Sequence, residues 1–140
     1  MSGAQKRILL VDDEPAILKT VGKRLQVAGF QVAVATDGPA GLQKAQDDPP
    51  DLIILDVMLP ALNGFDVCTR LKQDPRTKHI PVILFTAKDQ EEDYWKGKAC
   101  GADAYLTKPF KAEDLQQLAS RLVDALRREP PTREAGDAAV

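Results

Sequence analysis

The feature that most constrains the fold is the stretch DLIILDVMLP, residues 51–60. Its continuous apolar run, Leu52 to Leu55, is typical of a strand that is buried on both faces of a sheet. The run ends abruptly in a carboxylate, Asp56. Ligands bind beyond the carboxyl ends of the strands in open parallel α/β sheets, so this position makes Asp56 a candidate functional residue.

A second apolar run is also followed directly by acidic residues. Residues 7–11, RILLV, lead directly into Asp12, Asp13 and Glu14. If the two strands are neighbours, carboxylates from both meet at one edge of the sheet. Like charges at such short range favour a shared proton or a bound cation, so the pattern predicts a hard divalent metal, Mg²⁺ or Mn²⁺.

Strand and helix patterns alternate along the rest of the chain. Further strands are expected at residues 31–35, 81–86 and 104–107, and helices at 15–28, from the cap Asp37, at 65–71, at 91–100 and at 115–126. Five such alternations predict a three-layer α/β sandwich with five helices around a parallel sheet. Residues 129–140 lack periodicity and contain two prolines, which indicates a disordered tail or the stub of a linker.

Composition narrows the class of protein. A length of 140 residues fits one domain, and a net charge of -2 gives no basic surface for direct binding to nucleic acid. No apolar stretch is long enough for a membrane span or a signal core, so we expect a cytoplasmic protein with no membrane contact. Cys68 and Cys100 lack metal-ligand spacing, and we expect two reduced, half-buried thiols.

The predicted strands leave a chemically coherent set of side chains at their carboxyl ends. The acids could hold Mg²⁺, and a carboxylate beside the metal can act as a nucleophile that forms an aspartyl phosphate. A hydroxyl and an ammonium can bind phosphoryl oxygens. No glycine-rich phosphate loop, HExxH motif or GxSxG motif accompanies the set. Its members are Asp12, Asp13, Asp56, Thr86 and Lys108.

Four motifs carry a resemblance to a known family. LLVDDEP, DLIILDVMLPALNGFDV, PVILFTAK and GADAYLTKPF resemble, in order and spacing, the receiver domains of bacterial two-component response regulators. The resemblance covers about residues 6–127. It implies a chemotaxis-type, flavodoxin-like fold with strand order 2-1-3-4-5. We therefore expect a receiver domain at residues 6–128, after a short N-terminal tail at 1–5.

The resemblance also implies roles for individual residues. Asp56 would be the phosphoacceptor, Asp13 and the main-chain carbonyl of Met58 would bind Mg²⁺ directly, and Asp12 would hold the metal mainly through water. Lys108 would pair with the phosphoryl group, and its bond to Pro109 would be cis. Thr86 and Tyr105 would form the switch pair.

The implied partners follow from the same resemblance. A sensor histidine kinase, a phosphotransfer protein or a small acyl phosphate would donate the phosphoryl group. The surface of the fourth helix, fifth strand and fifth helix would then change shape and bind a downstream protein or a second copy of the chain.

Met58 and Lys88 offer no carboxylate or amide to orient an attacking water, which predicts slow self-dephosphorylation.

This role is that of a phosphoacceptor signalling domain and not of an enzyme with a separate substrate. Two other functions use related chemistry or a related fold. An aspartyl-phosphate phosphatase usually needs a second aspartate two residues after its nucleophile, where this chain has Met58. A flavodoxin-like redox carrier needs a phosphate-binding loop after the first strand, where Asp12, Asp13 and Glu14 repel phosphate. The sequence leaves open whether the domain acts alone or belongs to a longer protein.

Overall fold

A single parallel sheet organises the protein. The computed structural model describes residues 5–86, 100–107 and 110–128. The strands are β1 (Arg7–Val11), β2 (Gln31–Ala35), β3 (Leu52–Asp56), β4 (Val82–Thr86) and β5 (Ala104–Thr107). All four pairings are parallel and the order is β2-β1-β3-β4-β5, which confirms the predicted sheet.

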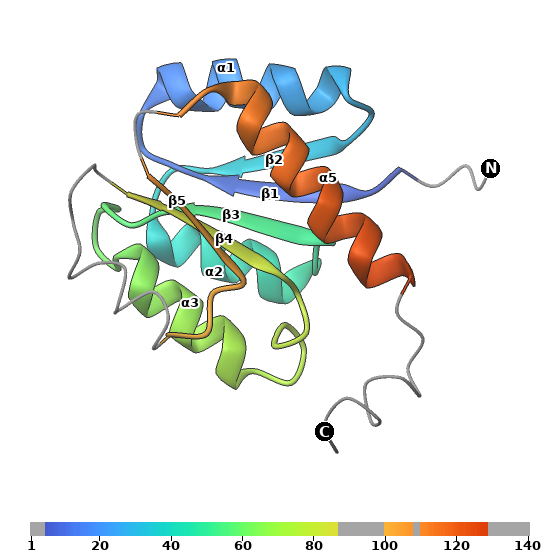
Figure 1. The fold of residues 1–140 in the computed structure, drawn as a ribbon. Coiled ribbons are helices and arrows are strands. Elements are labelled where there is room, and N and C mark those ends of the chain that lie inside the picture. Colours follow the sequence, from blue (N-terminus) through green and yellow to red (C-terminus); the bar gives the residue numbers. More distant parts are fainter. Residues whose placement is uncertain (1–4, 87–99, 108–109, 129–140) are drawn as a thin grey trace.

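Helices cover both faces of this sheet, so the predicted three-layer sandwich is confirmed (Figure 1). α1 (Pro15–Val27) and α5 (Ala112–Arg128) pack side by side on one face. α2 (Gly38–Asp47) and α3 (Gly64–Gln73) pack side by side on the other. The helix predicted at 91–100 falls almost entirely outside the described residues, which accounts for four described helices against five predicted.

The buried strands alternate their side chains between two apolar layers. Leu9 of β1 and Ile53 of β3 are paired and belong to the core beneath α2 and α3. Ile8 and Leu52, the preceding pair, belong to the core beneath α1 and α5. Because both faces of β1 and β3 are covered, a continuous apolar run is the pattern these strands require.

Local sequence signals set the helix ends that lie near the sheet's carboxyl edge. Asp37 caps α2, its carboxylate accepting a hydrogen bond from the Ala40 N–H at 2.7 Å. Asn63 caps α3 in the same way through the Asp66 N–H, at 3.0 Å. Each cap satisfies a main-chain donor that the first turn of a helix leaves unpaired. The predicted role of Asp37 is confirmed.

The burial predicted for the two cysteines was wrong. Neither cysteine is in a disulfide, and Cys68 has an exposed fraction of 0% and Cys100 of 8%. Cys68 lies on the face of α3 that packs on the sheet, beside the buried Val67. The two thiols therefore belong to the core and are not half-exposed.

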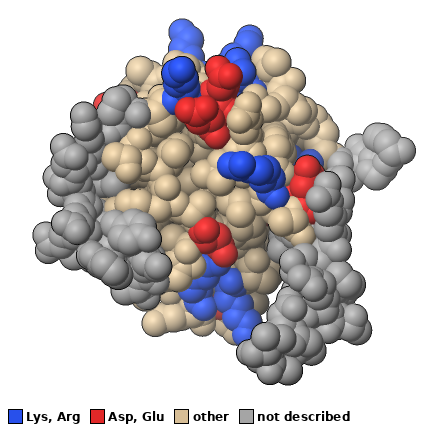
Figure 2. All heavy atoms as spheres, in the orientation of Figure 1, with Lys and Arg blue, Asp and Glu red and all other residues tan. Residues whose placement is uncertain are grey.

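The described surface shows mixed charge. On the face drawn in Figure 2, acidic and basic side chains are interspersed, and the described residues form no continuous basic surface there. None of the helices in the described part of the chain combines the length and the apolar character needed to cross a bilayer.

Candidate functional site

Asp56 is the last residue of β3, in the middle of the sheet. It pairs with Phe85 of β4, and its side chain has an exposed fraction of only 2%. One carboxylate oxygen, Oδ1, accepts a hydrogen bond from the Met58 N–H at 3.0 Å. The strand and this hydrogen bond together fix the direction of the carboxylate at the sheet's carboxyl edge.

Asp12 and Asp13 follow β1, the neighbour of β3. Asp12 is completely buried, while Asp13 is exposed. The Asp12 N–H donates to the Ala35 carbonyl of β2 at 3.1 Å, and Asp12 Oδ1 accepts from the Glu14 N–H at 2.8 Å. Asp12 therefore connects the end of the sheet to the start of α1.

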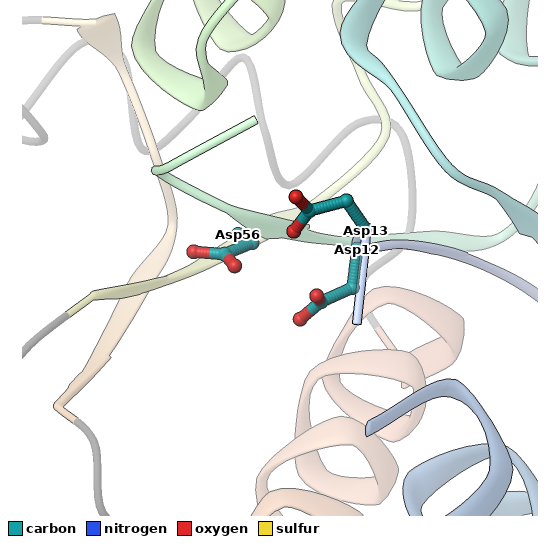
Figure 3. Close-up of side chains that lie close together, drawn as sticks. All are labelled: Asp12, Asp13 and Asp56. Atoms are coloured by element: carbon teal, nitrogen blue, oxygen red, sulfur yellow. The ribbon is translucent and has the colours of Figure 1, made fainter. Parts of the chain in front are cut away.

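The three carboxylates converge as the sequence predicted. Asp12, Asp13 and Asp56 each offer an oxygen, and these oxygens lie within 4.8 Å of one another (Figure 3). Such a set of hard oxygen donors, two of them buried, suits Mg²⁺, which is bound through one or two carboxylates with water in the remaining positions. A cation of that charge also offsets the repulsion between carboxylates brought so close together.

The loop between β3 and α3 begins directly after Asp56 and makes main-chain contacts with the end of β3. Met58 follows Asp56 by two residues, and 70% of its side chain is exposed. Ala61 has a φ of 70°, a left-handed conformation that is uncommon for a residue with a side chain. The Gly64 N–H donates to the Val57 carbonyl at 2.9 Å and returns the chain to the end of β3.

Two glycine contacts that hold this loop were not predicted. A β-carbon on Gly64 would overlap the main-chain oxygen of Asp56, and one on Gly38 would overlap the main-chain oxygen of Leu62. Both glycines directly follow a helix-capping residue, Asp37 or Asn63. A capping residue followed by glycine at the start of two helices could have been recognised in the sequence. The atoms that each glycine contacts could not, because they depend on how the elements pack.

The predicted switch residues occupy the two strands beyond β3. Thr86 is the last residue of β4 and pairs with Thr107 at the end of β5. Tyr105 of β5 is partly buried and packs against the core beneath α2 and α3. The sheet therefore brings the main chain of Thr86 to the edge where Asp56 lies.

Lys108 and Pro109, with the cis peptide predicted between them, lie outside the described residues. Their neighbours are described on both sides. Thr107 ends β5, and the Phe110 ring packs edge-on against Phe85 of β4 with ring centroids 5.3 Å apart. This aromatic contact fixes the chain where it leaves the sheet for α5.

Comparison with known proteins identifies the family. The family model described as the response regulator receiver domain matches residues 8–120. The chain is 48% identical over 122 residues to the DNA-binding dual master transcriptional regulator RpaA of Synechocystis sp., covering 87% of this chain and 49% of that protein. It is 43% identical over 109 residues to protein PilH of Pseudomonas aeruginosa, covering 78% of this chain and 90% of PilH. The chain thus spans about half the length of the first relative and most of the second.

A solved structure shares the fold. The receiver domain of a sensor histidine kinase from Pseudomonas aeruginosa, with a magnesium ion coordinated in its active-site cleft, aligns with a TM-score of 0.80 at 29% identity. The alignment covers 86% of this chain and 99% of that one. With the sheet order and the acidic cluster at its edge, these matches show that the chain belongs to the family of receiver domains of two-component response regulators.

Proposed function

We propose that Asp56 is the phosphoacceptor of this receiver domain and that it is phosphorylated in a Mg²⁺-dependent reaction. The observation that carries the proposal is the convergence of Asp12, Asp13 and Asp56 within 4.8 Å at the carboxyl edge of the sheet. A carboxylate oxygen of Asp56 attacks phosphorus in line. As the new O–P bond forms, the donor's P–N bond breaks, and the electron pair remains on the donor's imidazole nitrogen.

Each acid has a distinct part in this proposal. Asp13, which is exposed, would bind the metal directly, together with Asp56 and the Met58 carbonyl. Asp12, which is buried and already accepts the Glu14 N–H, would hold the metal mainly through water. Mg²⁺ supplies the positive charge that neutralises phosphoryl oxygens during transfer.

Lys108 and Thr86 complete the proposed site. Thr86 pairs with Thr107, the residue that directly precedes Lys108 in the chain. This register of β4 and β5 supports a joint role for Thr86 and Lys108. Lys108 pairs with the phosphoryl oxygens. The Thr86 hydroxyl follows the new charge, and Tyr105, partly buried on the adjacent strand, turns further inward.

The proposed donor is a sensor histidine kinase or a phosphotransfer protein. The output is a change in the surface of β5, α5 and the helix predicted at 91–100, which binds a downstream protein or a second copy of the chain. The phosphorylated and unphosphorylated packings are two populations of one protein, and phosphorylation shifts the balance between them.

Phosphorylation by a small donor tests this function directly. The protein is incubated with acetyl phosphate and Mg²⁺, and intact mass is measured before and after treatment with hydroxylamine, which cleaves acyl phosphates. We expect wild type to gain one hydroxylamine-labile phosphoryl group, and the gain to vanish with excess EDTA. Asp56→Asn should gain none.

A matched variant controls for the loss of one negative charge. Asp124 lies exposed on α5, so Asp124→Asn should be phosphorylated like wild type. An Asp56→Asn protein that still acquired a labile phosphoryl group would remove Asp56 from the proposed role.

A further inference from the structure

Two cysteines far apart in the sequence meet between α3 and the chain that leads into β5. Cys68 and Cys100 are separated by 32 positions, and neither is in a disulfide. The Cys68 thiol donates to the main-chain oxygen of Cys100 at 3.5 Å, so the two residues are in direct contact. The phosphoacceptor role uses neither residue.

A second contact fixes the same two segments. Lys72 lies one turn after Cys68 in α3, and its Nζ donates to Asp103 Oδ2 at 3.0 Å and to the Ile80 carbonyl at 2.8 Å. Its side chain also lies beside Gly101, which has a φ of 91°. Residues 100–103 are therefore held against α3 at two points, which keep Cys68 and Cys100 beside each other.

The surroundings give the two thiols different acidities. A hydrogen bond from the Cys68 thiol, assisted by the Ala102 N–H, lowers the pKa of Cys100 to about 7. The hydrogen bond to Cys100 and burial raise the pKa of Cys68. Cys100 is therefore the more acidic of the two thiols and the one that more readily becomes a thiolate, the nucleophilic form of cysteine.

We propose that Cys68 and Cys100 form a redox-responsive dithiol that closes to an intramolecular disulfide when the protein meets hydrogen peroxide. The Cys100 thiolate attacks a peroxide oxygen; the S–O bond forms, the O–O bond breaks, and the departing hydroxide takes a proton to become water. The Cys68 sulfur then attacks the Cys100 sulfenic acid and releases a second water. Two thiols are oxidised, and one peroxide is reduced to two waters.

The bridge would connect α3 to the approach to β5. Cys100 precedes Ala104, the first residue of β5, by four positions, and Tyr105 follows it in that strand. The disulfide would thus restrain this segment in oxidising conditions and release it in reducing ones. Formation of the bridge is independent of the function proposed for Asp56.

Thiol counting tests the proposal without Mg²⁺ or a phosphoryl donor. Reduced protein is treated with hydrogen peroxide, quenched with catalase and unfolded, and its thiols are titrated with Ellman's reagent. We expect both thiols to disappear together, with a mass loss of two hydrogen atoms and a monomer on a non-reducing gel. Dithiothreitol should restore both thiols.

Single-cysteine variants separate a bridge from independent oxidation. In Cys68→Ser, no second thiol remains to trap the Cys100 sulfenic acid, which should proceed to sulfinic acid, a gain of two oxygen atoms. In Cys100→Ser, Cys68 should react at least about tenfold more slowly than Cys100 does, because Cys68 is completely buried and its thiol is the less acidic of the two. Sulfinic acids, or a disulfide-linked dimer, as the main product of wild type would overturn the proposal.

The pH dependence of alkylation provides a readout for the contact itself. The rate at which iodoacetamide modifies Cys100 should rise with pH to half its maximum near pH 7 in wild type. Cys68→Ala removes the donor and should move this midpoint to higher pH. An unchanged midpoint in Cys68→Ala would show that the two thiols do not interact.

Discussion

Gly64 lies against the main chain of Asp56 so closely that a β-carbon on the glycine would overlap the Asp56 carbonyl oxygen and come within 2.9 Å of the Val57 Cα. The Gly64 N–H also donates to the Val57 carbonyl at 2.9 Å. The first residue of α3 is therefore fixed directly on the end of the strand that carries the proposed phosphoacceptor. A change at Gly64 must displace either α3 or Asp56.

Gly64→Ala should impair both folding and phosphorylation. The clash is with main-chain atoms, which cannot move aside as a flexible side chain can, so we expect a loss of about 1–3 kcal/mol in the free energy of unfolding. Displacement of Asp56 should also slow its phosphorylation by acetyl phosphate. Urea denaturation and intact mass measure the two effects.

Gly22→Ala is the matched control. Gly22 is buried in α1, but a β-carbon on it would meet nothing within 4 Å. Alanine favours a helix interior over glycine, so this variant should gain about 0.5–1 kcal/mol and retain the wild-type phosphorylation rate. Equal stability of Gly64→Ala and wild type would contradict the packing described here.

Removal of one carboxylate from the acidic cluster should greatly weaken the stabilisation of the protein by magnesium. For wild type, a Mg²⁺ concentration of 100 times the dissociation constant should raise the free energy of unfolding by about 2.7 kcal/mol. Asp13→Asn should lose most of this gain. Without Mg²⁺ it should be at least as stable as wild type, because one of three mutually repelling carboxylates is gone. Thermal unfolding with and without Mg²⁺ measures both effects.

Asp124→Asn controls for the loss of one negative charge, because Asp124 is an exposed acid of α5 that does not belong to the cluster. It should keep the full magnesium response. If Asp13→Asn were stabilised by Mg²⁺ as strongly as wild type, the metal would not be bound by the cluster.

The sequence predicted most of the sheet and its acidic edge because strand burial leaves a strong local signal. An apolar run that ends in Asp56 can be recognised without knowledge of its neighbours. The different burial of Asp12 and Asp13 could not be recognised, because two adjacent aspartates have the same local pattern. The difference in burial depends on which of the two side chains faces the start of α1, where Asp12 accepts the Glu14 N–H.

Local sequence patterns could not predict the contacts between segments that are distant in the chain. Cys68 follows the helical period of α3, but its partner lies 32 positions away on the approach to β5. The contact of Gly64 with Asp56 depends in the same way on how α3 returns to β3. Such relationships are fixed by tertiary packing, and a single sequence carries no direct signal for them.

The pair of Lys72 and Asp103 should contribute more to stability than an exposed ion pair. Asp103 Oδ2 accepts from Lys72 Nζ at 3.0 Å and also from the Val82 N–H at 2.8 Å, at the start of β4. Asp103→Ala would leave that N–H without this acceptor, at a cost of about 1–3 kcal/mol. Urea denaturation at neutral pH measures the change.

Asp48→Ala provides the comparison. Asp48 pairs with Arg7 at 2.6 Å, but 77% of its side chain is exposed. Exposed pairs contribute at most about 1 kcal/mol, so this variant should lose clearly less stability than Asp103→Ala. An equal loss in the two variants would show that the Val82 contact contributes nothing.

Met58 should control how long the phosphoryl group survives on Asp56. Met58 is 70% exposed, and its N–H donates to Asp56 Oδ1. The residue therefore lies in solvent directly beside the proposed phosphoacceptor. A thioether is a weak hydrogen-bond acceptor and cannot donate, so it orients an attacking water poorly. The amide of Met58→Asn can both donate and accept, and we expect this variant to lose its phosphoryl group several-fold faster.

Dephosphorylation is followed by intact mass after removal of acetyl phosphate, with Mg²⁺ retained. Val27→Asn makes the same kind of exchange at an apolar side chain that is 73% exposed at the end of α1, and it should leave the rate unchanged. If Met58→Asn lost its phosphoryl group no faster than wild type, water access to Asp56 would be governed elsewhere. The identity of this side chain would then not set the lifetime of the phosphorylated state.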